Sequence, residues 1–495
     1  MGYDVVIIGT GMAGLTAGAL LAKKGLKVLL LEKASQPGGY VVSFRKKGFT
    51  FDATGVFVGG CEPGGEFEAL LRDADVRLEF KRIDAIRNIY PGFEIALQEG
   101  GFNHYIERLR ALFPDEKRGI EEYEHTIVRI GAEVKALSDI TWYEKILFPL
   151  FFWNLVRFSA TTHKAILDRL FKGNEIKMAL SSLPVTVPPS QLSFLFVATL
   201  LSKVISKGAY YPEGGMGVIS KALAGSIERS GGTIRYRTEA TRILAQGNKV
   251  TGVVTDGGEV IEAPTVISNA SLPQTFRRLL SGGLPSSLAR RMERLEYSLS
   301  NFIVYLGVRG DAELDSLPFF TYLRSISNLE GEYGMLRRGE IPENPTVIMV
   351  VPSLIDPSLA PKGTHTVKLL TVAPYGYRDE WGKANRQSYQ AIKEEMAQRL
   401  MAHVESRVVP GLRGKILFCE AATPITLQRY TGNEQGAMYG LAATPSQFGR
   451  HRPPNRTPIK GLYLAGHYTR PAHGIVGAAT SGSFAAKMIL SGLNG

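Results

Sequence analysis

Residues 9–14 read Gly-Thr-Gly-Met-Ala-Gly, and they separate the apolar segment 4–8 from the small-residue stretch 15–24. This pattern predicts a strand, a glycine loop and a helix in immediate succession. The first glycine lets the chain turn after the strand, the second lets the backbone approach a phosphate, and the third lets the helix pack against the sheet. The start of the helix would face the phosphates with free N–H groups and a positive dipole.

A second apolar strand is predicted at residues 27–31, and it ends in Glu32. A carboxylate in this place can accept hydrogen bonds from both hydroxyls of an adenosine ribose, and it would repel a 2'-phosphate. The order strand, loop, helix, strand and acid therefore predicts a dinucleotide site. Pro37-Gly38-Gly39-Tyr40 comes next, where the chain either folds back over the same pyrophosphate or makes an ordinary turn.

The other end of the chain carries a second set of glycines. Residues 461–465 (GLYLA) predict a short buried strand, followed by 466–469 (GHYT) and by 473–477 (HGIVG), which opens a small-residue helix over 478–490. A helix start aimed at a flavin would stabilise the negative charge that develops on reduction. We therefore expect both ends of the chain to meet at one cofactor.

Together, these segments resemble the carotenoid desaturase superfamily of FAD oxidoreductases, and within it the retinol saturase and carotenoid isomerase branch. The resemblance rests on the two glycine clusters with Glu32, and on segments 48–55 (GFTFDATG), 210–215 (YYPEGG) and 461–482 (GLYLAGHYTRPAHGIVGAATSG). It implies an α/β fold with a Rossmann-type, amine-oxidase-like FAD-binding domain and an inserted α+β substrate domain.

The resemblance also implies cofactor contacts, position by position. They are the pyrophosphate contacts Gly9, Gly11, Met12, Ala13, Gly14, Gly38 and Gly39, the ribose contact Glu32, the adenine contact Ala240, and the flavin or ribityl contacts Gly466, His467, Ile475 and Val476. Many relatives have an acid where His467 stands. Its imidazole therefore either binds a phosphate or ribityl oxygen or packs away from the site.

No catalytic acid or base is predicted. Tyr210, Tyr211 and Glu213 lie where the chain would return from the substrate domain to the cofactor domain, so they are candidates to line the reacting end. The neighbouring proline and glycines also fit a role in which these residues simply form a turn.

The motif positions divide the chain. One discontinuous FAD-binding domain is predicted from residues 1–60, 208–285 and 412–495. It would contain a hairpin at 249–263, before the strand 266–270. The remaining residues predict a substrate domain: 61–207, mostly helical, and 286–411, with strand-like runs at 302–308, 346–351 and 366–372 and helix over 379–407.

Composition narrows the possible partners and compartment. Two cysteines, Cys61 and Cys419, cannot form a disulfide framework or a CxxC pair, and no HExxH motif is present, so we expect a reduced, cytoplasmic setting and no metal. The chain enters its first strand without a basic leader, so no signal peptide is expected. The net charge of 58 − 46 = +12 favours an anionic partner. Without a zinc finger or an aromatic RNP motif, an anionic membrane is favoured over nucleic acid.

Residues 140–158 are rich in aromatic side chains, and Lys145 and Arg157 bound their apolar run. The run is shorter than the ~20 apolar residues that cross a bilayer, and Pro149 interrupts it. It is either an interfacial segment, which would make the protein peripherally membrane-associated, or a buried helical hairpin. The apolar stretch 192–204 would supply a partner helix.

Three functions fit these features. The first is an FAD-dependent oxidoreductase that saturates, desaturates or isomerises carbon–carbon double bonds of a carotenoid, retinoid or other isoprenoid lipid. The second is an amine-oxidase-like flavoenzyme with a soluble substrate, which the aromatic segment 140–158 disfavours. The third is a non-catalytic lipid carrier on the same fold.

Overall fold

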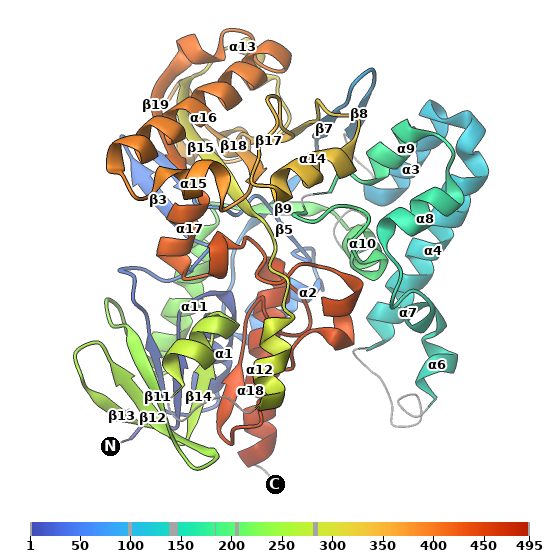
Figure 1. The fold of residues 1–495 in the computed structure, drawn as a ribbon. Coiled ribbons are helices and arrows are strands. Elements are labelled where there is room, and N and C mark those ends of the chain that lie inside the picture. Colours follow the sequence, from blue (N-terminus) through green and yellow to red (C-terminus); the bar gives the residue numbers. More distant parts are fainter. Residues whose placement is uncertain are drawn as a thin grey trace.

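The computed structural model describes residues 2–97, 101–137, 147–183, 185–202, 207–280 and 286–493. Both chain termini lie in the same part of the molecule, beside a parallel sheet, while a larger sheet and a helical lobe occupy the other end and one side (Figure 1). The two ends of the chain therefore converge, as the glycine clusters predicted.

A five-stranded sheet of parallel strands carries the predicted dinucleotide loop. Four of its five strands are largely apolar and buried on both faces, which is typical of parallel sheets covered by helices. Helix α1 (Met12–Lys23) packs against α11 (Gly217–Arg229) and α18 (Gly474–Leu493). In spatial order the strands are β10 (Thr233–Arg235), β2 (Val28–Leu31), β1 (Val5–Ile8), β14 (Thr265–Ser268) and β20 (Leu462–Leu464).

The predicted hairpin is confirmed. Strand β12 (Lys249–Thr255) pairs antiparallel with both β11 (Ala240–Gln246) and β13 (Val260–Glu262). The chain then returns to the parallel sheet at β14, where Val266 lies beside Val6 of β1.

A seven-stranded sheet forms the opposite end of the molecule (Figure 1). It contains the three strands predicted at 302–308, 346–351 and 366–372, and the helix α16 (Arg386–Arg407) packs beside it. Its strands in order are β19 (Ile416–Ala422), β15 (Ser300–Arg309), β18 (Thr364–Ala373), β17 (Val347–Val350), β16 (Phe320–Leu323), β7 (Ile86–Ile89) and β8 (Glu94–Leu97).

This sheet contains strands that were not expected in it. Strand β19 lies in the stretch 412–495 assigned to the cofactor domain, but it pairs with β15 of the seven-stranded sheet, so the assignment was wrong for this strand. The stretch 61–207 is mostly helical, as expected, but it also contains β7 and β8, and β7 pairs with β16. Short strands at sheet edges have weak periodic signals, and only the tertiary structure decides which sheet they join. The domain boundaries themselves stay a prediction.

A helical lobe stands beside the two sheets. Its long helix α4 (Lys117–Ala136) buries Ile120, Tyr123, Ile127 and Ile130 along one face, as an amphipathic helix does. The other helices of the lobe are α3 (Gly101–Leu112), α6 (Phe148–Phe151), α7 (Trp153–Arg157), α8 (His163–Leu170), α9 (Asn174–Leu180) and α10 (Phe194–Leu200).

Shorter elements join these parts. They are β3 (Ser43–Lys46), β4 (Phe49–Asp52), β5 (Val58–Gly59), α2 (Glu66–Asp73), β6 (Phe80–Ile83), β9 (Ala209–Pro212), a π-helix at Gln274–Leu279, α12 (Ser286–Glu293), α13 (Ala312–Asp315), α14 (Leu329–Arg337), α15 (Tyr377–Gly382) and α17 (Pro424–Thr431).

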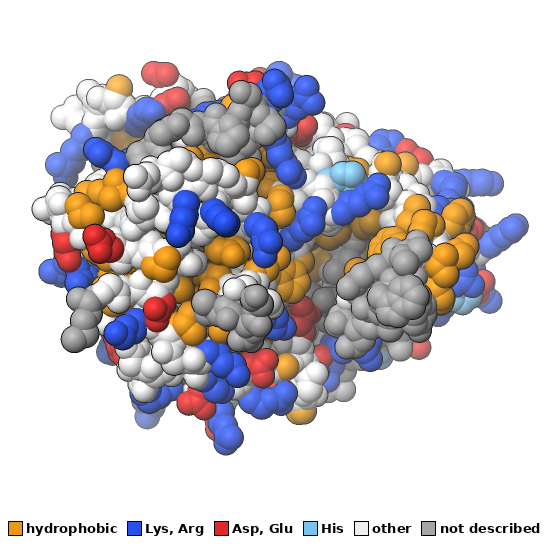
Figure 2. Space-filling view, turned by 90° about the horizontal axis from the view of Figure 1, so that it is seen from below, with side chains coloured by type: hydrophobic (Ala, Val, Ile, Leu, Met, Phe, Trp, Pro, Cys, Tyr) orange, Lys and Arg blue, Asp and Glu red, His pale blue; other side chains and the backbone are white. Residues whose placement is uncertain are grey.

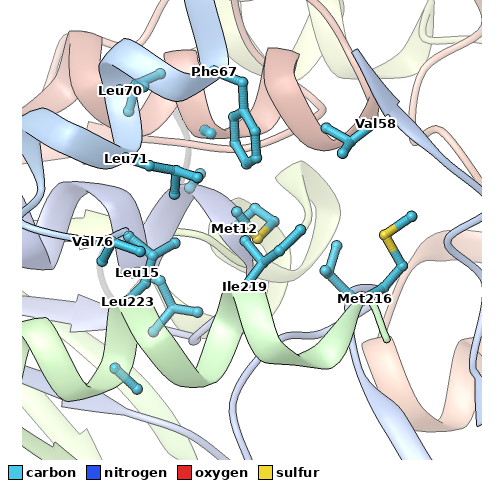
Figure 3. Close-up of a cluster of buried hydrophobic side chains, with 14 of the residues drawn as sticks. Met12, Leu15, Val58, Phe67, Leu70, Leu71, Val76, Met216, Ile219 and Leu223 are labelled. Atoms are coloured by element: carbon cyan, nitrogen blue, oxygen red, sulfur yellow. The ribbon is translucent and has the colours of Figure 1, made fainter. Parts of the chain in front are cut away.

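The core beneath the dinucleotide loop joins three helices. Figure 3 shows Met12 of α1, Phe67 of α2 and Ile219 of α11 pointing toward one another. All three side chains are buried, and Phe67 is fully enclosed. This packing sets the position at which α1 begins, and therefore the position of the glycine loop.

We expect Phe67→Leu to lower the free energy of unfolding by about 1 kcal/mol, because the smaller side chain leaves a gap between the three helices. Urea-induced unfolding measures the change. The control is Phe484→Leu on α18, where the side chain is 36% exposed and the expected change is below ~0.5 kcal/mol. Equal losses in the two variants would contradict this account of the core.

Candidate functional site

A cavity of about 410 Å³ lies between the parallel sheet, the seven-stranded sheet and the helical lobe. All the predicted cofactor-binding residues line it except Gly14. Gly14 lies behind the loop, where a Cβ atom would stand 2.1 Å from the Gly9 carbonyl oxygen. Its place in the structure is that of a packing glycine.

The loop and the second glycine pair form one cradle. Gly11 is the N-cap of α1, and the Gly38 N–H donates to the Thr10 carbonyl at 2.9 Å, so the two glycine segments run side by side. Gly38 has a φ of +130°, and a Cβ atom there would lie 2.2 Å from the Val41 carbonyl oxygen. The chain after Glu32 therefore runs back beside the loop, as the first of the two alternatives for this segment requires.

Glu32 is held in place by neighbouring donors. One carboxylate oxygen accepts from Thr10 N at 2.8 Å and from Thr10 Oγ1 at 2.6 Å, and the other accepts from Ala34 N at 2.8 Å. The side chain is buried but lines the cavity. A carboxylate oxygen can accept more than one hydrogen bond, so the group can still receive ribose hydroxyls.

Asn269 ties the two ends of the chain together, and the sequence analysis missed it. Its Nδ2 donates to the Ala465 carbonyl at 2.9 Å, and its Oδ1 accepts from Gly14 N at 3.2 Å. Gly466 passes so close that a Cβ atom would lie 2.7 Å from Asn269 Nδ2. Its position directly after a buried parallel strand was the signal, because ligands bind at the carboxyl ends of such strands.

His467 lines the cavity as a neutral ring. Burial, assisted by Arg452, lowers the pKa of its imidazole to about 3. Its Nε2 lies 3.3 Å from Asn433 Oδ1, and Gly440 packs against the ring edge. Of the two roles left open, these contacts favour a packed residue whose ring nitrogen is engaged by the protein.

Tyr210, Tyr211 and Glu213 do not line the cavity, so their suggested place at the reacting end was wrong. The Tyr211 hydroxyl donates to Asp52 Oδ2 at 2.5 Å within the core. Tyr210 lies on β9, and Glu213 forms an exposed ion pair with Lys81 at 3.7 Å. The three residues instead belong to strand β9 and the turn after it, which is the alternative that proline and glycine suggested.

Lys368 is a buried cation behind the cavity wall. Its ammonium group donates to the carbonyl oxygens of Gly55 at 2.5 Å, Asp52 at 3.3 Å and Thr54 at 3.4 Å. Burial lowers the pKa of the ammonium to about 8, although the nearby Asp52 opposes the shift. Since Thr54 and Gly55 line the cavity, Lys368 fixes the position of that wall.

Because Lys368 is buried, the free energy of unfolding should change with pH in the alkaline range. Its pKa falls from 10.5 to about 8 on folding, so between these values the unfolded chain holds a proton that the native protein has lost. Stability then rises with pH. We expect wild type to gain stability relative to Lys368→Met from pH 8 to about 10.5, as measured by urea unfolding at several pH values. Parallel stability curves for the two proteins would refute the assignment.

The cavity has two chemically different ends. Its charged lining residues lie beside Glu32 and Ala240: they are Lys33, Glu239 and Arg278, the last two forming an ion pair at 3.1 Å. The other end, which we call the apolar end, is lined by Val56, Phe57, Val58, Phe196, Leu200, Phe320, Ile348, Met438, Tyr439 and His473. Burial lowers the pKa of His473 well below its usual value, so the apolar end presents no ionised side chain among the described residues.

The aromatic segment 140–158 is partly described, because residues 140–146 lie outside the described ranges. Helix α7 docks on α4 through Glu133, which accepts from the backbone N–H groups of Asn154 and Leu155 at 3.1 and 2.9 Å, and α6 contacts α7. Within the ranges that the structure describes, no helix has the length and apolar character needed to cross a membrane.

Four apolar side chains of this segment are exposed, which disfavours a fully buried hairpin. They form what we call the α6–α7 patch: Leu147 (43% exposed), Leu150 (76%), Phe151 (48%) and Trp153 (57%). The predicted partner helix is α10, which packs on α4, and its Phe196 and Leu200 line the cavity. Residues 203–204 of that stretch lie outside the described ranges.

Comparisons with known proteins agree with this geometry. The model of the family described as flavin containing amine oxidoreductase matches residues 12–490. The chain is 28% identical to prolycopene isomerase of Daucus carota over 99% of this chain and 80% of the relative. It is 27% identical to phytoene desaturase (neurosporene-forming) of Rhodobacter capsulatus, over 98% and 93%, and 26% identical to all-trans-retinol 13,14-reductase of Danio rerio, over 97% and 85%.

Solved structures show the same fold. Putrescine oxidase bound to putrescine superposes with a TM-score of 0.67 at 15% identity, over 99% of both chains. An oxidoreductase from Methanosarcina mazei has a TM-score of 0.66 at 16% identity, over 99% of this chain and all of the other.

The residues present fit FAD. At Gly11, Gly38 and Gly466, a Cβ atom would collide with neighbouring protein atoms. Only glycine fits at these positions, and without side chains the backbone of the cradle stays accessible to a ligand. The carboxylate of Glu32 and the starts of α1 and α18 meet at the same cavity, in the order that a ribose, a pyrophosphate and a flavin require. The chain therefore belongs to the flavin containing amine oxidoreductase family and is an FAD-dependent oxidoreductase.

Proposed function

We propose that the protein acts on carbon–carbon double bonds of a hydrophobic isoprenoid polyene of the carotenoid or retinoid type, by saturation, desaturation or isomerisation. The observation that carries the proposal is the apolar end of the cavity, which continues directly from the cofactor cradle. A polyene offers few polar groups, so its binding free energy comes from burial of apolar area at ~25 cal/mol per Å². The curated relatives named above support this substrate class.

We further propose how this chain holds its cofactor. The backbone of Gly11, Met12 and Ala13 would bind the pyrophosphate, with Gly9, Gly38 and Gly39 closing the cradle. Glu32 would bind the ribose, Ala240 the adenine, and Gly466, Ile475 and Val476 the flavin side, with the neutral ring of His467 packed beside them. When bound, FAD supplies the exchange of electrons with the substrate double bond.

The protein's own contribution is positioning and exclusion of water. Phe57 and Phe320 contact each other, with ring centroids 6.2 Å apart, and Ile348 and Met438 pack in the same apolar cluster. These side chains present flat apolar surface to an extended substrate. A dry cavity also protects reactive species from hydrolysis and stray proton transfer.

The cavity is less suitable for an amine substrate. An ammonium group buried in a cavity is stabilised by a carboxylate close to the reacting centre. Among the described residues of the apolar end no carboxylate is present, and the acidic lining residues Glu32 and Glu239 belong to the end beside Ala240. This arrangement favours the polyene over the amine.

We also propose that the protein is cytoplasmic and associates peripherally with an anionic membrane through the α6–α7 patch. Figure 2 shows apolar side chains gathered at the end of the helical lobe, and on the same face Lys and Arg outnumber Asp and Glu. Trp and Phe partition well into the membrane interface, and basic groups attract anionic headgroups. Since α4 contacts both α7 and α10, the patch is linked to the cavity wall.

Anaerobic turnover tests the substrate proposal. Purified protein should be yellow and should bleach with dithionite. With reduced or oxidised cofactor, it should convert an isoprenoid polyene to a product with an altered double bond, detected by chromatography and absorbance, while putrescine gives no turnover. Conversion of the amine without conversion of any polyene would overturn the proposal. A colourless protein that FAD cannot reconstitute would favour the carrier function.

A further inference from the structure

His473 places a polar ring in the wall of the apolar end. The ring lies between Phe196 and Tyr439, with ring centroids 4.8 and 4.7 Å away. It precedes α18, and the side chain lines the main cavity. Contact with aromatic rings on two sides limits the rotation of the imidazole. Its nitrogen atoms therefore have defined directions in a wall that is otherwise almost entirely apolar.

The two ring nitrogens have different surroundings. Nδ1 is fully buried and has no hydrogen-bond partner among the described residues. A second, small cavity of about 10 Å³ borders His473, Ser298 and Tyr439, with room for about one water molecule. Nε2 is not among these enclosed, unpartnered atoms, and His473 lines the main cavity, so we infer that the ring edge carrying Nε2 faces that cavity.

The neutral ring must carry its single proton on one of these nitrogens. Burial, together with Arg452 and His467, keeps the pKa of the imidazole well below its usual value, so the ring is uncharged. With the proton on Nε2, the main cavity receives an N–H donor, and Nδ1 can accept from a water in the small cavity. With the proton on Nδ1, the same water can accept from Nδ1–H, and Nε2 is an acceptor. A hydroxyl group can pair with Nε2 in either tautomer, because it both donates and accepts.

We propose that His473 is a specificity-determining residue whose Nε2 forms a hydrogen bond with a hydroxyl group, so that the preferred substrate is a hydroxylated polyene and not a pure hydrocarbon. This inference rests on the proposed polyene function and narrows it. A hydrocarbon bound across His473 would leave Nε2 without a hydrogen-bond partner in a dry wall. Sites built to hydrogen-bond a substrate discriminate strongly against analogues that lack the group.

Equilibrium binding to the FAD-loaded protein tests the inference. The probes are all-trans-retinol and the matched hydrocarbon in which a methyl group replaces the hydroxymethyl group, each titrated in the same detergent and followed by changes in polyene absorbance. Wild type should bind the alcohol about tenfold more tightly than the hydrocarbon. His473→Phe should abolish that preference by weakening alcohol binding, while hydrocarbon binding is kept or improved.

One further variant sharpens the test. His473→Gln retains a side chain that can donate or accept a hydrogen bond, and it should keep part of the preference. The visible flavin absorbance per protein shows that each variant is folded and loaded. The comparison of the two probes on wild type needs no variant at all.

Each outcome is decisive. Equal affinity of wild type for alcohol and hydrocarbon would overturn the inference and leave the polyene function standing. The inference would also be overturned if His473→Phe reduced the affinity for both probes equally, because that pattern indicates a packing role for His473. Failure of wild type to bind either probe would overturn the proposed function itself.

Discussion

Gly11→Val protein should purify without flavin and be colourless, whereas wild type is yellow. A Cβ atom at Gly11 would lie 2.6 Å from Asn269 Oδ1, and Asn269 cannot move away freely because it also bonds Gly14 and Ala465. The remaining atoms of the valine side chain would stand where the backbone meets the pyrophosphate. We expect the loss of all cofactor-dependent activity, measured as visible flavin absorbance per protein and as turnover.

The matched control is Gly376→Val. Gly376 has a φ of −78°, and a Cβ atom there meets nothing within 4 Å, so the same substitution should leave flavin content unchanged. Far-ultraviolet circular dichroism of the Gly11 variant separates a blocked site from an unfolded chain. A folded Gly11→Val protein that is fully loaded with flavin would contradict the assignment of the cradle.

The triple variant Leu150→Gln, Phe151→Gln and Trp153→Gln should lose most of its affinity for anionic vesicles. These side chains are 76%, 48% and 57% exposed, respectively, so the change removes apolar surface that packing of the described chain does not use fully. At about 1 kcal/mol for each side chain that enters the interface, the partition constant should fall about a hundredfold. Co-sedimentation with vesicles of mixed neutral and anionic lipid measures the loss.

The control replaces exposed apolar side chains elsewhere. Val260 on β13 and Leu417 on β19 are 58% and 46% exposed, and a Val260→Gln, Leu417→Gln double variant should bind vesicles as wild type does. Binding of wild type should also weaken at high salt, because basic groups contribute through screened electrostatics. If the triple variant sediments with vesicles unchanged, the α6–α7 patch is not the membrane contact.

Local signals explain which parts of the site were predictable. Some residues are required by the local backbone conformation or by direct contact with the ligand, so they can be recognised without knowledge of the fold. These are the glycines of residues 9–14, Glu32 and the pair Gly38-Gly39. The hairpin and the long strands β15 and β18 were also predictable, because their periodicity runs over many residues. Three residues were assigned no role or a wrong one, because each forms its hydrogen bonds with residues more than 100 positions away in the sequence. They are Lys368, Asn269 and Tyr211.

The family, the glycine loop and the meeting of the two chain ends could be read from the sequence, since close backbone approach and helix starts demand particular residues in a particular order. The placement of β19, the exclusion of Tyr211 from the cavity, the buried cation at Lys368 and the polar ring of His473 in an apolar wall became visible in the three-dimensional fold. Burial and long-range partners set the charge and the direction of a side chain, and the residues next to it in the sequence specify neither its burial nor those partners.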